Sequence, residues 1–370
     1  MKKAAQPFSH PLHGADLRTL LSIRALYGPP DHPRGRRRFA AALLSAALRL
    51  PFTASEKAWV GLTRGRLPPM APPVFIVGHW RSGTTHLFNI LARSPRFQTI
   101  SPVTAGLPWD FLILGRLLKP LLEKTIPKDR IIDNVPVTPH SPQEDEIALA
   151  SMTDQSYYHG LYFPRHLRES IGRNLFFDGA SPADRARWAA TVRYFLEKVS
   201  RLGKNRVLLL KNPLYTARIP VLRAMFPGAR FIHIHRHPRE VIRSTRGFYR
   251  KLLPWLALQE FSPADIDEVV FEIYDRMMRT LAADTADLPP DQFLEIPFRE
   301  LETDPMPLLE RAFSRFGLDG WAESGPPMAA YLRSIRQYRK NTYPPDEEDR
   351  RTIDRRARFA FDRWGYAPGE

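Results

Sequence analysis

The sequence predicts a P-loop-like α/β fold, in which a central parallel sheet lies between two layers of helices, with a helical arm at the N-terminus. Three observations lead to this prediction. Short apolar runs indicate strands that are buried on both faces. Stretches with helical spacing separate these runs. A loop with two glycines comes after the first run and leads into a helix. The predicted strands are residues 74–77, 207–210, 231–235 and 292–296.

The residues after each strand support its assignment. The run 74–77 is followed by a turn and then by apolar residues at helical spacing over 85–92. The run 231–235 ends at Arg236-His237-Pro238, and a helix is predicted from Arg239. Long amphipathic stretches over 183–202 and 264–283 predict two further helices. This alternation of strand and helix is typical of a parallel sheet.

Proline-rich stretches suggest how the chain is divided. A cluster of prolines around residues 68–73 ends the helical arm, which we expect over residues 1–72. The α/β domain is then predicted over 73–370. The proline-rich span 102–142 predicts an excursion over the sheet edge, and we expect an insertion over about 102–170 to contact substrate.

Composition limits the possible functions. The chain has 55 Lys and Arg residues against 39 Asp and Glu, a net charge of +16. Such an excess favours a polyanionic partner, which includes nucleic acid, an anionic membrane and a phosphorylated ligand. There are no cysteines, which excludes disulfides, Cys-ligated zinc, iron–sulfur clusters and a thiol nucleophile.

The basic arm has two interpretations. Its apolar segment, Phe39 to Leu50, is 12 residues long and too short to span a bilayer. A helix packed on the domain is the favoured interpretation. Because the segment comes after Arg34, Arg36, Arg37 and Arg38, a helix lying on an anionic membrane surface is the alternative. We expect a cytoplasmic protein, with this arm as the candidate for peripheral membrane contact.

The strongest local motif is the loop GHWRSGTT, residues 78–85. It lies between a strand and a helix, where backbone N–H groups and the helix dipole bind anions. A Walker A loop requires Lys after its second glycine, and Thr84 occupies that position here. The cation is Arg81, inside the loop. The motif therefore predicts a phosphate-like ligand and disfavours a Mg-bound triphosphate.

With these features the chain resembles the sulfotransferases that use PAPS (3′-phosphoadenosine 5′-phosphosulfate). In that family a loop of the form (Lys/Arg)-Ser-Gly-Thr-Thr binds the 5′-phosphosulfate, and an Arg with a Ser eight residues later binds the 3′-phosphate. Arg236 and Ser244 have that spacing. The resemblance covers residues 73–317 and is closest to the bacterial group related to the tyrosylprotein and glycan enzymes. The matching loop residues are Arg81, Ser82, Gly83, Thr84 and Thr85.

The resemblance implies further cofactor contacts. Family members often carry Tyr-Glu-x-Leu, whose aromatic ring lies by the adenine. This chain has Phe298 at that position, which keeps the ring and loses the hydroxyl. The Arg-Lys-Gly loop of the cytosolic enzymes is absent as such, and Arg339 and Lys340 are its loose counterpart on a basic stretch. The alternative for these two residues is a solvated helix end.

The resemblance also implies the chemistry. A base activates an acceptor hydroxyl or amine, and cations stabilise the leaving phosphate. The segment QEDE supplies the base, with Glu144 as first choice, Glu146 as second and the neighbouring His140 as a third candidate. Capping of the next helix is the ordinary alternative for these acids. Arg81 and Lys211 are the candidate cations, although Lys211 also fits a plain surface lysine.

Several rival interpretations remain open at this stage. A small-molecule kinase would need the Walker A lysine, which this loop lacks. A non-enzymatic binder of polyanions or of a membrane surface would need only the net positive charge. No nucleic-acid-binding motif is present in the sequence. His233, His235 and His237 alternate as metal ligands can, but no carboxylate pattern completes a site, and the family requires no metal. A small-molecule, lipid or glycan acceptor fits the resemblance. Candidate acceptor-pocket aromatics, which also fit a core, are Trp109, Phe111, Tyr157, Tyr158 and Tyr162.

Overall fold

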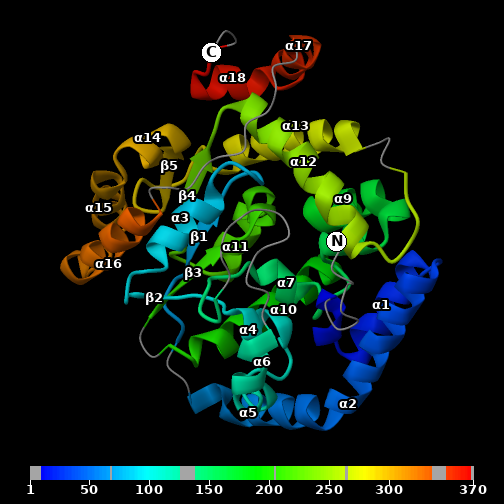
Figure 1. Cartoon of the computed structure of the whole chain (residues 1–370). Helices are drawn as coiled ribbons and strands as arrows, with labels where there is room; N and C mark the ends of the chain where they lie inside the picture. The colour runs from blue at the N-terminus through cyan, green and yellow to red at the C-terminus, as the bar shows by residue number, and fades with distance from the viewer. Residues whose placement is uncertain are drawn as a thin grey trace. The chain divides into compact units, whose positions relative to one another are not determined.

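The computed structural model describes residues 10–66, 69–125, 138–203, 206–262, 266–335 and 347–367. The chain divides into two compact units, whose helices and strands are labelled in Figure 1. Unit 1 comprises 1–70, 100–204 and 251–263, so it joins the predicted arm to the predicted insertion. Unit 2 comprises 71–99, 205–250 and 264–370 and contains the sheet.

The sheet of unit 2 has five strands in the order β2-β3-β1-β4-β5. All of its pairings are parallel, and Val74 at the start of β1 is aligned with Leu209 on one side and Arg230 on the other. The α/β prediction is confirmed. The strand β2 was not predicted, because two residues give no pattern. The strands are β1 (Val74–Val77), β2 (Phe97–Gln98), β3 (Val207–Lys211), β4 (Arg230–His235) and β5 (Phe293–Pro297).

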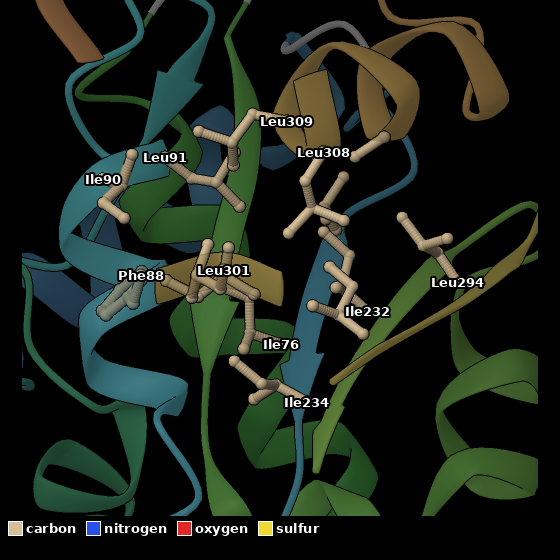
Figure 2. Close-up of a cluster of buried hydrophobic side chains, with 14 of the residues drawn as sticks. Ile76, Phe88, Ile90, Leu91, Ile232, Ile234, Leu294, Leu301, Leu308 and Leu309 are labelled. Carbon is tan, nitrogen blue, oxygen red and sulfur yellow. The ribbon is translucent and has the colours of Figure 1, made fainter. Parts of the chain in front are cut away.

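Apolar side chains cover both faces of the sheet, as a three-layer fold requires. On one face Ile76, Ile232 and Leu294 pack against three helices, as Figure 2 shows. These helices are α3 (Thr84–Leu91), α14 (Phe298–Thr303) and α15 (Pro305–Arg315). On the other face Phe75 stacks on Phe231, with ring centroids 5.4 Å apart. The whole of β1 is buried, which explains its unbroken apolar run.

The helices of unit 2 agree with the predicted alternation. The helix expected over 85–92 is α3, and the one expected over 264–283 is α13, each within about two residues. Helix α12 begins in unit 2, and its last residues belong to unit 1. The helices are α3 (Thr84–Leu91), α11 (Ile219–Met225), α12 (Pro238–Leu256), α13 (Ile266–Asp284), α14 (Phe298–Thr303), α15 (Pro305–Arg315), α16 (Trp321–Ser334), α17 (Glu347–Arg356) and α18 (Arg358–Trp364), with the 3-10 turn η4 (Pro213–Ala217).

Unit 1 is helical in its described residues. The predicted helix over 183–202 is α10, which starts with a capping box between Ser181 and Asp184. The segment 39–50 is the middle of a much longer helix, α2, which continues through Pro51. The helices are α1 (Leu17–Tyr27), α2 (Pro33–Thr63), α4 (Pro102–Gly106), α5 (Leu114–Leu117), α6 (Lys119–Thr125), α7 (Asp145–Leu149), α8 (Tyr158–Tyr162), α9 (Leu167–Leu175) and α10 (Pro182–Ser200), with 3-10 turns η1 (Pro11–Gly14), η2 (Arg64–Arg66) and η3 (Pro164–His166).

Candidate functional site

The loop between β1 and α3 has a backbone shaped for close approach of a ligand. Gly78, Arg81 and Gly83 all have positive φ, at 140°, 70° and 105°. Arg81 is not a glycine, so its left-handed backbone is a local strain of the kind that collects at functional sites. A bond from the Ser82 amide to the His79 carbonyl (3.2 Å) closes the turn. Gly78 donates its own amide to Thr216 Oγ1 at 2.8 Å, a support that no sequence pattern signalled.

The start of α3 is suited to an anion. Its N-cap, Gly83, provides no side-chain hydrogen bond. The first amides of an α-helix lack acceptors within the helix, so those of Thr84 and Thr85 are oriented to serve a ligand. Ser82 is 2% exposed, and its Oγ has no hydrogen-bond partner within the described residues. A buried hydroxyl without a partner is costly, and a phosphate or sulfate oxygen would satisfy it.

The two anion motifs predicted from the sequence meet in unit 2. Arg81 Nε donates to Ser244 Oγ at 2.9 Å, across 163 residues of sequence. The next residue of α12, Thr245, shares its single hydroxyl proton between the Val241 carbonyl at 2.7 Å and the Trp80 carbonyl at 3.4 Å. Helix α12 is therefore tied to the loop by side-chain bonds at two successive residues.

Arg236 lies at the carboxyl end of β4 with two kinds of contact. It forms a two-pronged pair with Glu240, with Nε–Oε2 at 2.9 Å and Nη2–Oε1 at 2.5 Å. Its guanidinium also lies over the Phe298 ring, 4.6 Å from the centroid. Phe298 in turn packs tightly on Gly83, where an added Cβ would be 2.2 Å from Phe298 Cδ2. Phe298 thus contacts a residue from each of the two motifs.

Lys211 ends β3 and is 3% exposed. The alternative of a plain surface lysine therefore does not describe it. Its Cα is aligned with that of Ile76 in β1, one strand away and two residues before the loop. The carboxyl ends of parallel strands share one sheet edge, so the register places Lys211 on the side of the sheet where the loop begins. After it, Asn212 caps η4 by accepting from the Leu214 amide at 3.0 Å.

His79 is part of the loop but faces the interior of unit 2. Its ring is 1% exposed, donates from Nδ1 to the Trp80 carbonyl (2.9 Å) and lies edge-on to Tyr274. Burial lowers the pKa of His79 to about 4, so the ring is neutral at pH 7. These contacts give it a packing role beneath the anion loop.

The acidic segment belongs to unit 1, where it begins α7. Glu144 is the N-cap, makes no side-chain cap bond and is half-buried. Its Oε2 accepts from the Tyr158 hydroxyl at 3.3 Å. The segment is held in place by Gln143, whose amide donates to the Ile100 carbonyl at 2.9 Å. His140, three residues earlier, is exposed on a turn.

Glu146 is in a different environment. It is 1% exposed, and its Oε1 accepts from Ser156 Oγ at 2.6 Å and from the Tyr157 amide at 3.1 Å. These bonds use its charge to hold the loop that leads into α8. Asp145 is also buried. Glu144 is thus half-buried while the next two acids are buried, a difference that their sequence spacing did not reveal.

The aromatic residues considered for an acceptor pocket are mainly part of the core of unit 1. Tyr157 and Tyr162 are both 0% exposed, and Phe111 is packed edge-on against Phe195. Trp109 donates its Nε1 to the Ser151 carbonyl at 2.9 Å. Tyr158 is the half-buried member of the set that contacts Glu144.

The histidines of β4 pack against the C-terminal helix α18 and the residues just after it. His233 and His235 lie on one side of the strand, with His233 Nδ1 2.9 Å from Glu295 Oε1 and His235 Nδ1 2.8 Å from the Tyr366 hydroxyl. The ring of His235 stacks on Trp364. Over the part of the chain that the structure describes, no group of His, Asp and Glu side chains has the arrangement of a metal site.

Arg339 and Lys340, the remaining predicted cofactor contacts, lie outside the described residues. The chain after this gap is attached to α12 by ion pairs. Arg239 forms a two-pronged pair with Asp354 (both contacts 2.7 Å), and Arg243 pairs with Asp349 at 2.8 Å. Helix α17 is therefore anchored on the helix that carries Ser244.

Comparison with known proteins is consistent with this geometry. A sequence profile described as the sulfotransferase family matches residues 72–323. The omega-hydroxy-beta-dihydromenaquinone-9 sulfotransferases Stf3 of Mycobacterium bovis and Mycobacterium tuberculosis are each 31% identical over 295 residues, which is 80% of this chain and 75% of theirs.

Two solved structures share the fold. Sulfotransferase STF9 from Mycobacterium avium aligns with a TM-score of 0.71 at 17% identity, over 95% of this chain and 92% of that one. Sulfotransferase STF1 from Mycobacterium tuberculosis aligns with a TM-score of 0.65 at 17% identity, over 91% and 89% of the two chains. At this identity the likeness concerns the fold.

Proposed function

This chain belongs to the sulfotransferase family, and we propose that it takes the sulfuryl group from PAPS and transfers it to the hydroxyl of a lipid-like acceptor. As a member of that family it is an enzyme of sulfuryl transfer. The donor is the part of the proposal that the geometry of unit 2 supports. The observation that carries it is the bond between Arg81 and Ser244, because it joins the two anion motifs at one place.

The residues present fit such a donor. PAPS carries phosphate groups at both ends of its ribose, so it requires two separate sets of anion donors. The loop offers the amides at the start of α3 and the hydroxyl of Ser82, whose oxygen has no hydrogen-bond partner among the described side chains and backbone groups. Arg236 and Ser244 offer a guanidinium and a hydroxyl to the second phosphate. Ser244 uses its oxygen as an acceptor for Arg81, which leaves its O–H to donate.

Each residue then has a role in the proposed reaction. When bound, PAPS supplies the sulfuryl group. Arg81 and Lys211 stabilise the negative charge that builds on the leaving phosphate as the bond between sulfur and the bridging oxygen breaks. Phe298 provides a flat apolar surface for the adenine, with Arg236 already stacked on its ring. Arg339 and Lys340 remain candidate contacts for the 3′-phosphate on the strength of the family resemblance.

We assign Glu144 as the general base. Its carboxylate takes the proton from the acceptor hydroxyl while the hydroxyl oxygen attacks sulfur, so the products are the sulfate ester and PAP. Glu144 is half-buried, so it keeps some access to solvent. Its carboxylate also accepts a hydrogen bond from the Tyr158 hydroxyl. Glu146 is the second candidate, although its carboxylate already accepts two hydrogen bonds in the interior. His140 is the third.

The acceptor class is inferred from the relatives. The Stf3 proteins are named for omega-hydroxy-beta-dihydromenaquinone-9, an acceptor with a hydroxyl group. We propose for this chain a hydroxyl on a small lipid-like molecule, which narrows the choice among small molecules, lipids and glycans.

Calorimetry tests the donor. We expect PAP to bind in the absence of Mg²⁺ and ATP to bind far more weakly, because the loop lacks the Walker A lysine. Arg81→Ala and Arg236→Ala should each weaken PAP binding. Arg223→Ala, an exposed arginine on α11, is the matched control that should leave it unchanged. If PAP does not bind, or if ATP with Mg²⁺ binds equally well, the donor assignment is wrong.

A further inference from the structure

Helix α2 of unit 1 buries several polar side chains and exposes several large apolar ones. Its buried residues include four polar side chains, Arg38, Arg49, Thr53 and Glu56. Its exposed residues include large apolar side chains: Leu44 is 60% exposed, Leu48 69% and Leu62 80%. A helix at a water-facing surface has the opposite arrangement.

Ion pairs and hydrogen bonds determine how helix α2 is oriented about its own axis, and therefore which of its side chains are buried. Arg49 pairs with Asp110, which also accepts from Thr53. Glu56 pairs with the fully buried Lys198, with Oε1 and Nζ 2.6 Å apart, and its Oε2 accepts from the Ile113 amide at 2.8 Å. Turning the leucines inward would expose these groups and leave their buried partners uncompensated, which is strongly unfavourable.

The exposed apolar side chains lie along one side of the helix. Positions three and four apart lie on the same side of a helix, and Leu44, Leu48, Pro51, Ser55, Ala58 and Leu62 follow one another at that spacing, with Ser55 as the polar member. The helix that carries this stripe has 31 residues and is about 46 Å long. We call this stripe, together with Trp59, the α2 face. The only acidic residue in α2 is Glu56, which is buried.

Basic residues lie at both ends of the α2 face. Arg34, Arg36 and Arg37 are exposed in its first turns, and Arg66 is exposed just after its end. None of these four arginines forms an ion pair with another described residue. Arg64, by contrast, pairs with Glu197. The surroundings of the apolar stripe are therefore positively charged.

Exposed apolar side chains are concentrated in unit 1. All of the large apolar residues that are strongly exposed in the described chain belong to it, and unit 2 contributes none. Besides the α2 face they include Leu21 and Leu26 of α1, a helix that Figure 1 shows beside α2, and Leu117 of α5. None of the described helices is both long and apolar enough to span a bilayer.

From these observations we propose that the α2 face docks on the surface of an anionic phospholipid bilayer. The helix lies parallel to the membrane, with its leucines among the upper acyl chains and its terminal arginines at the phosphates. Leucine side chains exposed between three arginines at one end and Arg66 at the other fit this environment. A protein partner of similar apolar character would not account for cations at both ends. The proposal does not depend on the identity of the sulfuryl donor.

Vesicle flotation tests the proposal with the full chain. We expect the protein to float with vesicles of phosphatidylcholine and phosphatidylglycerol and to remain largely unbound with phosphatidylcholine alone. The triple variant Leu44→Ser/Leu48→Ser/Leu62→Ser should reduce the partition coefficient between vesicles and water by at least about tenfold. Each change removes the favourable free energy of transferring an apolar side chain from water into the bilayer. These side chains are exposed, so the variant should keep the thermal midpoint and the PAP affinity of the parent.

A charge variant separates the arginines from the leucines. Arg36→Gln/Arg37→Gln should weaken binding to the anionic vesicles by about fivefold for each charge removed, and high salt should abolish the difference. Arg223→Gln/Arg333→Gln is the matched control, because it removes two exposed arginines from unit 2. If both pairs reduce binding equally, attraction is a matter of net charge, and the α2 face has no special role.

Trp59 provides a direct readout of insertion. It is 40% exposed on α2, and we expect brominated phospholipids to quench its fluorescence, a change that Trp59→Phe removes. The assignment of a membrane to the α2 face is wrong if the wild type fails to float with anionic vesicles. It is also wrong if sedimentation shows that the wild type is a dimer and the leucine variant a monomer, since the α2 face would then be an interface between two copies of the chain.

Discussion

Arg81 Nε lies 2.9 Å from Ser244 Oγ, so a residue of the anion loop and a residue of α12 form one hydrogen-bonded pair. The pair orients the Arg81 guanidinium from its Nε edge and leaves the other nitrogens to other contacts. It also makes the loop backbone, left-handed at Arg81, depend on a side chain far along the sequence. Removing either partner should therefore affect the binding of the whole donor.

Ser244→Ala removes the acceptor for Arg81 and a donor to the second phosphate. We expect PAP affinity to fall by about tenfold, because one or two hydrogen bonds to charged groups are lost. Isothermal titration with PAP measures the change. Ser334→Ala is the control, since Ser334 Oγ is exposed and donates to the nearby Tyr331 carbonyl at 2.7 Å. Unchanged affinity for the Ser244 variant would remove this residue from the site.

Glu240→Gln tests the role of the pair at the end of β4. Glu240 is a competitor for the Arg236 guanidinium, so replacing its charge with a neutral amide should make Arg236 a better phosphate ligand. We expect PAP to bind a few-fold more tightly, with a steeper dependence on salt. Weaker binding would instead mean that the carboxylate orients Arg236 for the phosphate.

Gly83→Ala should damage the loop. The added Cβ would be 2.2 Å from the Phe298 ring, at a residue whose φ is 105°. We expect a loss of at least about 2 kcal/mol in the free energy of unfolding together with a loss of PAP binding. Gly106→Ala is the matched control, because nothing lies within 4 Å of its added Cβ. Urea denaturation compares the two, and equal stabilities would contradict the packing described here.

Glu144→Gln and Glu146→Gln should separate catalysis from structure. We expect Glu144→Gln to keep PAP affinity and thermal midpoint while turnover with a hydroxyl acceptor falls by roughly a hundredfold or more. Glu146→Gln should mainly lower stability, by about 1–3 kcal/mol, because its buried oxygen accepts two hydrogen bonds. Turnover that is retained in the Glu144 variant would move the base to Glu146 or His140.

His10 predicts a specific acid sensitivity. Its Nε2 donates to the Leu256 carbonyl (3.0 Å) while its Nδ1 accepts from the Leu12 amide (3.2 Å), an arrangement that needs the neutral ring. Burial lowers the pKa of His10 to about 3, from an ordinary value of 6.5. Between these values only the unfolded chain binds the proton, so stability is complete above pH 6.5 and decreases as the pH falls.

The expected cost for His10 at pH 5 is about 2 kcal/mol relative to neutral pH. Urea denaturation at pH 7.5 and pH 5 measures it, with His10→Gln as the comparison. The variant should be less stable at pH 7.5 but should lose less stability on acidification than the parent. Identical losses in the two proteins would show that His10 does not contribute to the pH dependence.

Much of unit 2 was predictable from local patterns. The run 74–77 is apolar because β1 is buried on both faces, and the loop after it carries its glycines where φ is positive. The boundaries of α2 were not predictable in the same way. The apolar segment 39–50 indicated a shorter helix, whereas residues 33–63 form one helix. Its polar residues Arg49 and Glu56 have buried partners far along the chain.

The sequence by itself determined the alternation of strands and helices, the anion loop and the two cationic motifs, because each depends on residues that are close along the chain. Only the tertiary structure decided that Arg81 bonds to Ser244, that Phe298 packs on Gly83, and that Glu146 is buried while Glu144 keeps access to solvent. It also decided which side of α2 faces outward. These outcomes depend on contacts between distant segments, and an arginine or a leucine has the same local propensity on either side of a helix.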